Sequence, residues 1–127
     1  MTRILLVDDS AEVRRSVRAV LAGAVVDPIF GEAGDAAAAL ALLGHERWDV
    51  VVLDLSLPDR NGLDTLREMR RRQPALPVVV MSFHDQPEYA RAARGAGAAG
   101  YVAKGSESAA IAAAVTGALA AVPASGN

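Results

Sequence analysis

The sequence predicts an α/β domain with one doubly wound, five-stranded parallel sheet and helices on both faces. Five short apolar runs alternate with five segments whose apolar residues recur three and four positions apart. The runs are continuously apolar rather than alternating, as in strands that are buried on both faces. The chain has 127 residues without a linker or a repeat, so we expect one domain over 1–122 and a short flexible tail over 123–127.

The strands follow from the runs rich in valine, leucine and isoleucine. They are expected at 3–8, 25–32, 50–54, 77–82 and 100–103. The second run is the weakest, because Pro28 interrupts it. Proline within a strand pattern is typical of the edge of a sheet, so we expect this strand there.

The helices follow from capping residues and from apolar stripes. Ser10 and Asp35 are residue types that cap helix N-termini, and Pro74 and Pro123 end helical patterns. The helices are expected after Ser10, after Asp35, from Gly62 to before Pro74, over 87–95 and from Ser106 to about Val122. Their buried stripes are Val13, Val17 and Leu21, then Leu40 and Leu43, then Leu66 and Met69, and in the last helix Ile111, Val115, Leu119 and Val122.

Composition excludes several classes of function. The chain has no cysteine, which removes disulfides, thiol catalysis and zinc–thiolate sites. A net charge of −2 gives no basic surface for nucleic acid. The N-terminal apolar run stops at Asp8, too early for a signal peptide, and the alanine-rich segment after Glu107 is too weakly apolar to span a bilayer. We therefore expect a cytoplasmic protein.

Four of the expected strands end in polar residues that phosphoryl chemistry can use. The first leads into Asp8 and Asp9, and the others into Asp54, Ser82 and Lys104. The carboxyl ends of parallel strands meet at one edge, where open α/β sheets bind ligands. Two carboxylates about 5 Å apart repel by about 3 kcal/mol at an effective dielectric constant near 20. The sequence therefore predicts a hard divalent cation at this edge, with Mg²⁺ the best fit.

The cationic and hydroxyl residues of this set suggest a reaction. Lys104 is the only lysine among 13 basic residues, so a compact ammonium is favoured at this one position. No histidine is placed to activate Ser82 as a nucleophile, which argues against a serine hydrolase. An aspartate nucleophile beside Mg²⁺, with an ammonium and a hydroxyl to hold the transferred group, is typical of aspartyl-phosphate formation.

Four segments that carry these residues resemble, in order and spacing, the receiver domain of bacterial response regulators in two-component signalling. They are 7–10 (VDDS), 53–62 (LDLSLPDRNG), 81–85 (MSFHD) and 97–104 (GAAGYVAK). The resemblance covers nearly the whole chain. It implies a flavodoxin-like (CheY-like) fold with strand order 2-1-3-4-5.

The resemblance also implies roles for the acidic residues. Asp54 would accept a phosphoryl group from the phosphohistidine of a histidine kinase or phosphotransfer protein. Asp9, Asp54 and the carbonyl of Ser56 would bind Mg²⁺ directly, with Asp8 close by. Lys104 would hold the phosphoryl group. The expected protein is a signalling switch with weak self-catalysed phosphorylation and dephosphorylation.

Further residues are implied as the switch and as modulators of the site. Ser82 and Tyr101 would be the switch pair, which remodels the surface of the fourth helix, fifth strand and fifth helix. Phe83 is bulky for its position, and we hypothesise that it narrows access to Asp54. His84 follows and could reach the hydrolytic water.

The sequence leaves the output of the switch open. Gly105 follows Lys104 where many receivers have proline, as in the branch that usually carries a DNA-binding domain. No such domain is expected in these residues, so the output would be a protein partner or a missing domain. After Glu107 the chain has no charged side chain, and this helix face could be a docking surface, a phosphorylation-dependent dimer surface or merely helix-forming alanine.

Two other functions remain as alternatives. One is a phosphatase of the haloacid dehalogenase type, which needs a second aspartate where this chain has Ser56. The other is a pseudo-receiver, a class that tends to lose the acidic pocket or the lysine. Segment 95–100 spells G-x-G-x-x-G, but it ends a helix rather than opening one, so we expect no organic cofactor. His45 follows the second helix and is expected to be a surface residue.

Overall fold

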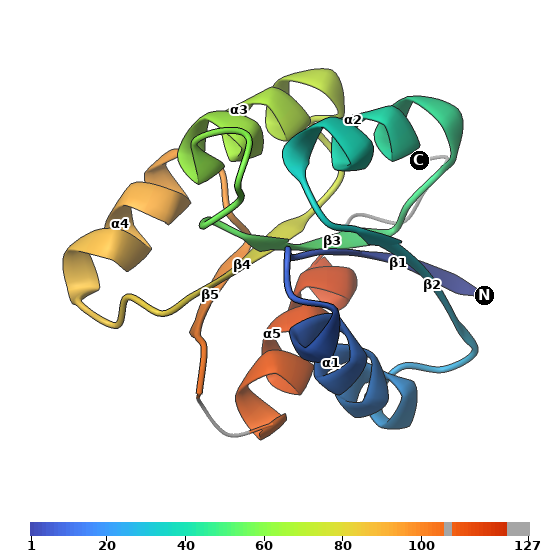
Figure 1. The fold of residues 1–127 in the computed structure, drawn as a ribbon. Helices are drawn as coiled ribbons and strands as arrows, with labels where there is room; N and C mark the ends of the chain where they lie inside the picture. The colour runs from blue at the N-terminus through green and yellow to red at the C-terminus, as the bar shows by residue number, and fades with distance from the viewer. Residues whose placement is uncertain (106–107, 122–127) are drawn as a thin grey trace.

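The sheet has five parallel strands in the order β2-β1-β3-β4-β5, which confirms the predicted order (Figure 1). The computed structural model describes residues 1–105 and 108–121. The strands are β1 (Thr2–Val7), β2 (Pro28–Ala33), β3 (Val50–Asp54), β4 (Val78–Ser82) and β5 (Gly100–Ala103). The central strands β3 and β4 are buried at every position, as their continuous apolar runs require.

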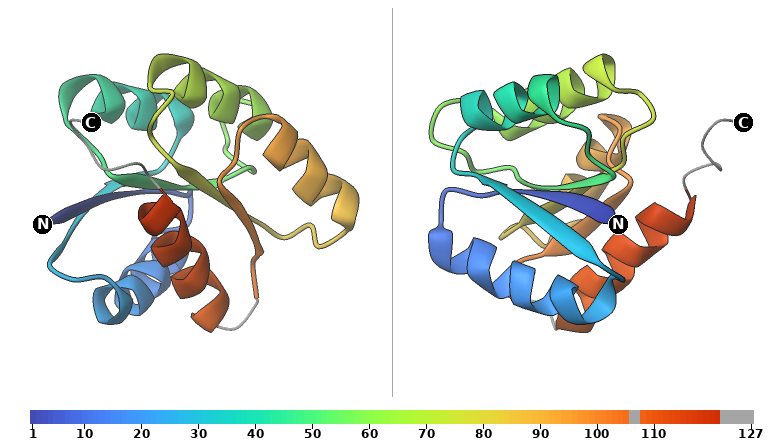
Figure 2. Two further views of the ribbon diagram at one scale, coloured as in Figure 1. Left: turned by 180° about the vertical axis from the view of Figure 1, so that it is seen from behind. Right: turned by 90° about the vertical axis from the view of Figure 1, so that its right-hand side faces the viewer.

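Helices cover both faces of the sheet, with α1 and α5 on one face and α2, α3 and α4 on the other (Figures 1 and 2). The helices are α1 (Ala11–Ala24), α2 (Ala36–His45), α3 (Gly62–Arg72), α4 (Pro87–Gly95) and α5 (Ser108–Ala121). Each face has its own apolar cluster. Leu5, Leu53 and Leu66 belong to the cluster under α2 and α3, and Ile4, Leu21 and Val115 to the one under α1 and α5.

The predicted capping residues begin their helices. The side chain of Ser10 accepts a hydrogen bond from the amide of Val13, and Asp35 accepts one from Ala38. These caps satisfy amide groups that have no partner within the helix. Both caps lie just after a strand, so they also fix where the chain leaves the carboxyl edge of the sheet.

Some predicted boundaries were wrong. The second strand begins at Pro28 rather than at 25, because Val25 still ends α1 by donating its amide to Leu21. Asp27 then turns the chain with a left-handed φ of 51°. Pro28 thus begins an edge strand instead of interrupting it, a position that tolerates the missing amide proton.

The apolar stripes also need small corrections. Val13 and Leu119 are only half-buried, and Ala118 is buried in α5 in place of Leu119. The predicted first and last residues of the fifth helix, Ser106 and Val122, and the predicted tail lie outside the described residues. Within the part of the chain that the structure describes, no helix is both long and apolar enough to cross a membrane.

Trp48 covers the sheet at the edge strand. Its ring lies on the backbone of Gly31, where an added Cβ would be only 2.3 Å from a ring carbon. Its indole nitrogen donates to the carbonyl of Leu42 at 3.1 Å, and the guanidinium of Arg3 lies 5.0 Å from the ring centroid. The residue is 6% exposed, so it joins α2 to β2 as part of the core.

We expect Gly31→Ala to destabilise the protein by about 1–3 kcal/mol, because the methyl group displaces the Trp48 ring. Trp48 is the only tryptophan. Its fluorescence should therefore shift to the red when urea unfolds the protein. The transition gives the free energy of unfolding, which we expect to be lower for Gly31→Ala than for wild type. Gly44→Ala is the control, since an added Cβ there meets nothing within 4 Å. Equal stability of the two variants would contradict this account of Gly31.

Candidate functional site

The predicted site residues meet at the carboxyl edge of the sheet. Asp8 directly follows β1, Asp54 and Ser82 are the last residues of β3 and β4, and Lys104 directly follows β5. In the pairing of the strands, Asp54 lies opposite Met81, and Ser82 opposite Ala103. The register therefore brings side chains from four strands together.

The acidic trio Asp8, Asp9 and Asp54 is a compact cluster. One carboxylate oxygen from each residue lies within 4.8 Å of the others. Asp8 and Asp54 are buried, and Asp9 is exposed. Three carboxylates at this distance repel one another strongly in a partly buried setting, so the cluster depends on a positive charge.

Lys104 supplies a positive charge. Its ammonium nitrogen lies 2.7 Å from Oδ2 of Asp8 and 3.1 Å from Oδ2 of Asp54. The lysine side chain is 6% exposed and that of Asp54 2%, so water screens this contact little. The backbone amide of Lys104 donates to the carbonyl of Ser82, which anchors the lysine to β4.

The pKa of Lys104 shows which effect prevails. Burial lowers the pKa of the ammonium, but its contacts with Asp8 and Asp54 outweigh burial, and the pKa lies above its ordinary value. Lys104 is therefore charged at neutral pH. One ammonium against three carboxylates still leaves excess negative charge in the pocket.

One oxygen of Asp54 shows that a cation fits this pocket. Oδ1 of Asp54 accepts a hydrogen bond from the amide of Ser56 at 3.0 Å. Oδ2 is buried and, among the described residues, has no hydrogen-bond partner, only the charge contact with Lys104. Lys104 meets part of the need of this oxygen, and a hard metal ion is a suitable further partner for it. The all-oxygen donor set fits Mg²⁺.

Arg14 supports the loop that carries Asp8, a role that the sequence analysis did not identify. Its guanidinium donates to the carbonyl of Asp8 at 2.5 Å and to the carboxylate of Glu32 at 2.8 Å. It thereby joins the loop after β1 to the edge strand β2. Arginine at a predicted surface position gives no signal of this contact, because the partners come from two other strands.

The loop after Asp54 is closed by a tight backbone contact. A Cβ on Gly62 would lie 2.2 Å from the carbonyl oxygen of Leu55, so the first turn of α3 packs directly on the chain after Asp54. The sequence analysis identified Gly62 as the start of α3, and the structure adds the reason for glycine. Any larger residue would push Leu55, and with it Asp54, out of place.

The predicted switch residues Ser82 and Tyr101 both contact the backbone of His84. The hydroxyl of Ser82, which is fully buried, accepts a hydrogen bond from the amide of His84 at 3.1 Å. The hydroxyl of Tyr101 donates to the carbonyl of the same His84. The His84 ring stacks on Tyr89 of α4, with centroids 4.1 Å apart. His84 thus connects both switch residues to α4.

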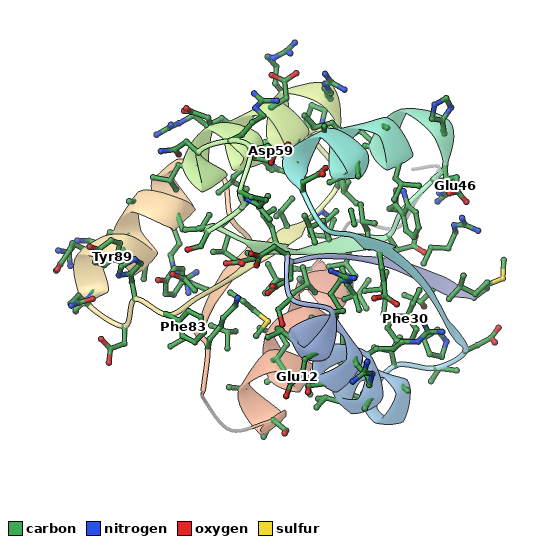
Figure 3. All side chains as sticks on the ribbon, viewed as in Figure 1. Glu12, Phe30, Glu46, Asp59, Phe83 and Tyr89 are labelled. Carbon is green, nitrogen blue, oxygen red and sulfur yellow. The ribbon has the colours of Figure 1, made fainter. Side chains whose placement is uncertain are left out.

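Phe83 lies beside the ammonium of Lys104. The residue is 73% exposed, and the Lys104 nitrogen is 4.9 Å from the ring centroid. Both residues border a groove of about 450 Å³ between α1 and α5, which Glu12 also lines. Phe83 and Glu12 are labelled in Figure 3. The structure therefore brings Phe83 next to the predicted site.

Two other sequence features lie apart from the site. His45 is the exposed last residue of α2, and the chain continues from it toward the start of β3, at the opposite edge of the sheet. The glycine-rich segment 95–100 ends α4 and enters β5, with Gly97 at a left-handed φ of 108°. Neither lies near the acidic trio.

Comparison with known proteins agrees with this geometry. Residues 4–116 match the family described as the response regulator receiver domain. The chain belongs to this family. Receiver domains are components of two-component signalling, so the resemblance stated from the motifs is confirmed, as is the CheY-like fold.

Individual relatives support the assignment. The DNA-binding transcriptional activator DevR/DosR of Mycobacterium tuberculosis is 38% identical over 104 residues, which are 82% of this chain and 48% of the relative. The receiver domain of NtrX from Brucella abortus has a TM-score of 0.85 at 31% identity, covering 93% of this chain and 98% of that one. A response regulator from Burkholderia pseudomallei, solved with a phosphorylated aspartic acid and a calcium ion, has a TM-score of 0.80 at 25% identity, covering 93% and 69%.

The ion pairs of Glu32 give a prediction on stability. The Arg14 hydrogen bond, assisted by Arg18, holds the pKa of Glu32 below its usual value. A carboxyl whose pKa is lower in the folded state stabilises the fold above its unfolded pKa of about 4.3 and loses this contribution as pH falls. We expect Glu32→Gln to cost about 0.2–1 kcal/mol at neutral pH, the range measured for ion pairs at the surface.

The measurement is urea unfolding of both proteins from neutral pH down through the acid range. The difference in unfolding free energy should shrink as the pH falls below about 4.3. A difference that stays constant across the range would contradict the role of the Glu32 charge.

Proposed function

We propose that this chain is a phosphorylation-driven switch in which Asp54 accepts a phosphoryl group from a phosphohistidine of a histidine kinase or phosphotransfer protein. A carboxylate oxygen of Asp54 bonds to phosphorus, and the imidazole leaves with the electrons of the nitrogen–phosphorus bond. The observation that carries the proposal is the buried Asp54 oxygen beside the Lys104 ammonium, 3.1 Å away, in an acidic pocket. The phosphorylated aspartic acid of the Burkholderia relative supports it.

Mg²⁺ is the proposed metal. Asp8, Asp9, Asp54 and the carbonyl of Ser56 would hold it. When bound, the ion neutralises the charge on the phosphoryl oxygens during transfer. The excess negative charge of the pocket favours its binding, and the buried Oδ2 of Asp54 has only the Lys104 ammonium as a partner among the described residues. The calcium ion in the Burkholderia relative is consistent with oxygen ligands of this kind.

Lys104 and Ser82 are proposed to hold the transferred group. Lys104 is charged and already contacts Asp54, so its ammonium can turn to a phosphoryl oxygen with little movement. The hydroxyl of Ser82 accepts from His84, which leaves its own proton free to donate. Both residues act by electrostatic stabilisation of the acyl phosphate.

The switch is proposed to act through His84. When the Ser82 hydroxyl turns to the phosphoryl group, it gives up its contact with the amide of His84. Tyr101 contacts the carbonyl of that residue, so its ring and the α4–β5–α5 surface respond together. The phosphoryl group thereby biases an element with two arrangements.

The alternatives have less support. A haloacid dehalogenase phosphatase requires an acid/base aspartate at the position of Ser56. A pseudo-receiver would not need the complete pocket that joins the acidic trio to Lys104. The switch, with weak self-catalysis rather than turnover of a substrate, therefore remains the proposed function.

The partners of the switch are proposed from its relatives. The chain spans about half the length of the curated relatives DevR/DosR and NarP that it matches. DevR/DosR is described as DNA-binding. We propose a receiver unit over 1–122 that acts in the cytoplasm on a protein partner or a separate output domain, without binding nucleic acid itself. The uncharged α5 face is the proposed docking or phosphorylation-dependent dimer surface.

We expect the wild-type protein to take up one phosphoryl group from a small phosphodonor with Mg²⁺, and Asp54→Ala to take up none. Intact mass measures the uptake, and a chelator should abolish it. Asp64→Ala is the control, because this exposed aspartate lies on α3 and pairs with Arg67. Beryllofluoride should shift the amide resonances near Ser82 and Tyr101. Uptake by Asp54→Ala equal to that of wild type would contradict the proposal.

We expect Phe83→Ala to speed both phosphoryl uptake and hydrolysis, by about two- to tenfold, because the ring narrows access to Asp54 and contacts the ammonium. The contact of an exposed ring with a cation amounts to about 0.5–1 kcal/mol, which sets the scale. Phe83→Leu keeps bulk without the aromatic ring and separates the two causes. His84→Ala tests, in the same assay, the proposed contact of His84 with the hydrolytic water. Unchanged rates of uptake and hydrolysis in Phe83→Ala would contradict the proposal that Phe83 narrows access to Asp54.

A further inference from the structure

Asp59 joins the loop after β3 to the first turn of α2. Its Oδ1 accepts a hydrogen bond from the amide of Ala36 at 2.9 Å, and its Oδ2 one from the amide of Ala37 at 3.0 Å. The partners are 23 and 22 residues away in the sequence. Figure 3 shows Asp59 between the loop before α3 and the start of α2.

This contact is additional to the cap that α2 already has. Asp35 begins the helix and accepts from the amide of Ala38 at 2.7 Å. Asp59 takes the two preceding amides, which are among the groups without partners inside the helix. These amide hydrogen bonds hold the pKa of Asp59 below its usual range, so both of its oxygens are acceptors at neutral pH.

The loop from Asp54 to α3 is therefore fixed at several points. The amide of Ser56 donates to Asp54, and Gly62 packs on the backbone of Leu55. Between these points Leu57 is buried in the core cluster, and the residues after it, 58–61, are exposed. Asp59 anchors this exposed part to a helix that packs on the sheet.

We propose that Asp59 is a positioning residue for the metal site: its bidentate contact with α2 holds the loop so that the carbonyl of Ser56 is preorganised for Mg²⁺. This inference rests on the proposed function. Asp59 itself bonds to backbone amides and is not a ligand. Outer-shell contacts of this kind orient ligands, and their loss commonly weakens metal affinity about 10- to 100-fold.

The test compares Asp59→Ala with Asp35→Ala. Both variants remove one carboxylate and one cap from the same end of α2, but only the first releases the loop. Mg²⁺ is titrated into each protein and followed by calorimetry and by amide resonances. We expect Asp59→Ala to bind Mg²⁺ about tenfold more weakly than wild type. Asp35→Ala should stay within about twofold, because its cap touches no residue of the loop.

Asp59→Asn separates position from charge, because it keeps an acceptor oxygen but not the charge. Recovery of part of the Mg²⁺ affinity by Asp59→Asn supports positioning, and equal weakening by Asn and Ala overturns it. Equal affinities of Asp59→Ala and Asp35→Ala, whether both weakened or both like wild type, also overturn it. If Asp59→Ala and Asp35→Ala are equal but the wild-type protein binds Mg²⁺ and takes up a phosphoryl group, only the role of Asp59 is overturned and the proposed function stands. A wild-type protein that does neither overturns both.

Discussion

The mutual repulsion of three carboxylates at one edge of the sheet is the constraint on which the site depends. Asp8, Asp9 and Asp54 lie together because parallel strands end at the same level, and the buried ones cannot be screened by water. Lys104 offsets only part of this charge. Such a pocket is stable enough to fold yet still favours an additional cation, and this combination makes it suitable for binding a metal and an anionic phosphoryl group.

Like charges stay close together only if the backbone that carries them is rigid. Three contacts make the backbone around the acidic trio rigid. Arg14 holds the carbonyl of Asp8 against the edge strand, and Gly62 lets α3 pack directly on Leu55. Asp59 anchors the same loop to α2. None of these residues belongs to the acidic trio. Each removes a way in which the carboxylates could move apart, so the charge density of the pocket is a property of the whole fold.

The sequence was sufficient for the strand order and for the convergence of the trio with Lys104. The order came from the resemblance, and the convergence from apolar runs that end in polar residues. It was not sufficient for Arg14 or Asp59. The Asp8 carbonyl and the two α2 amides that they contact are backbone groups, and the Glu32 carboxylate that also contacts Arg14 lies 18 residues away, so no local pattern marks these contacts. The start of β2 was misplaced because valines suit both a strand and the end of a helix, and the amide of Val25 bonds within α1.

The path that we propose from the pocket to the surface runs through the backbone of one residue, His84. Ser82 contacts the amide of His84 and Tyr101 its carbonyl, while the His84 ring lies on Tyr89. In the proposed switch the Ser82 hydroxyl moves toward the phosphoryl group to donate its proton, and this movement changes its geometry with the amide of His84. The core beside Ser82 is close-packed and resists small displacements. A displacement at Ser82 is therefore taken up where the chain is exposed. That place is the β4–α4 loop, so we propose His84 as the link between the phosphorylation site and the surface.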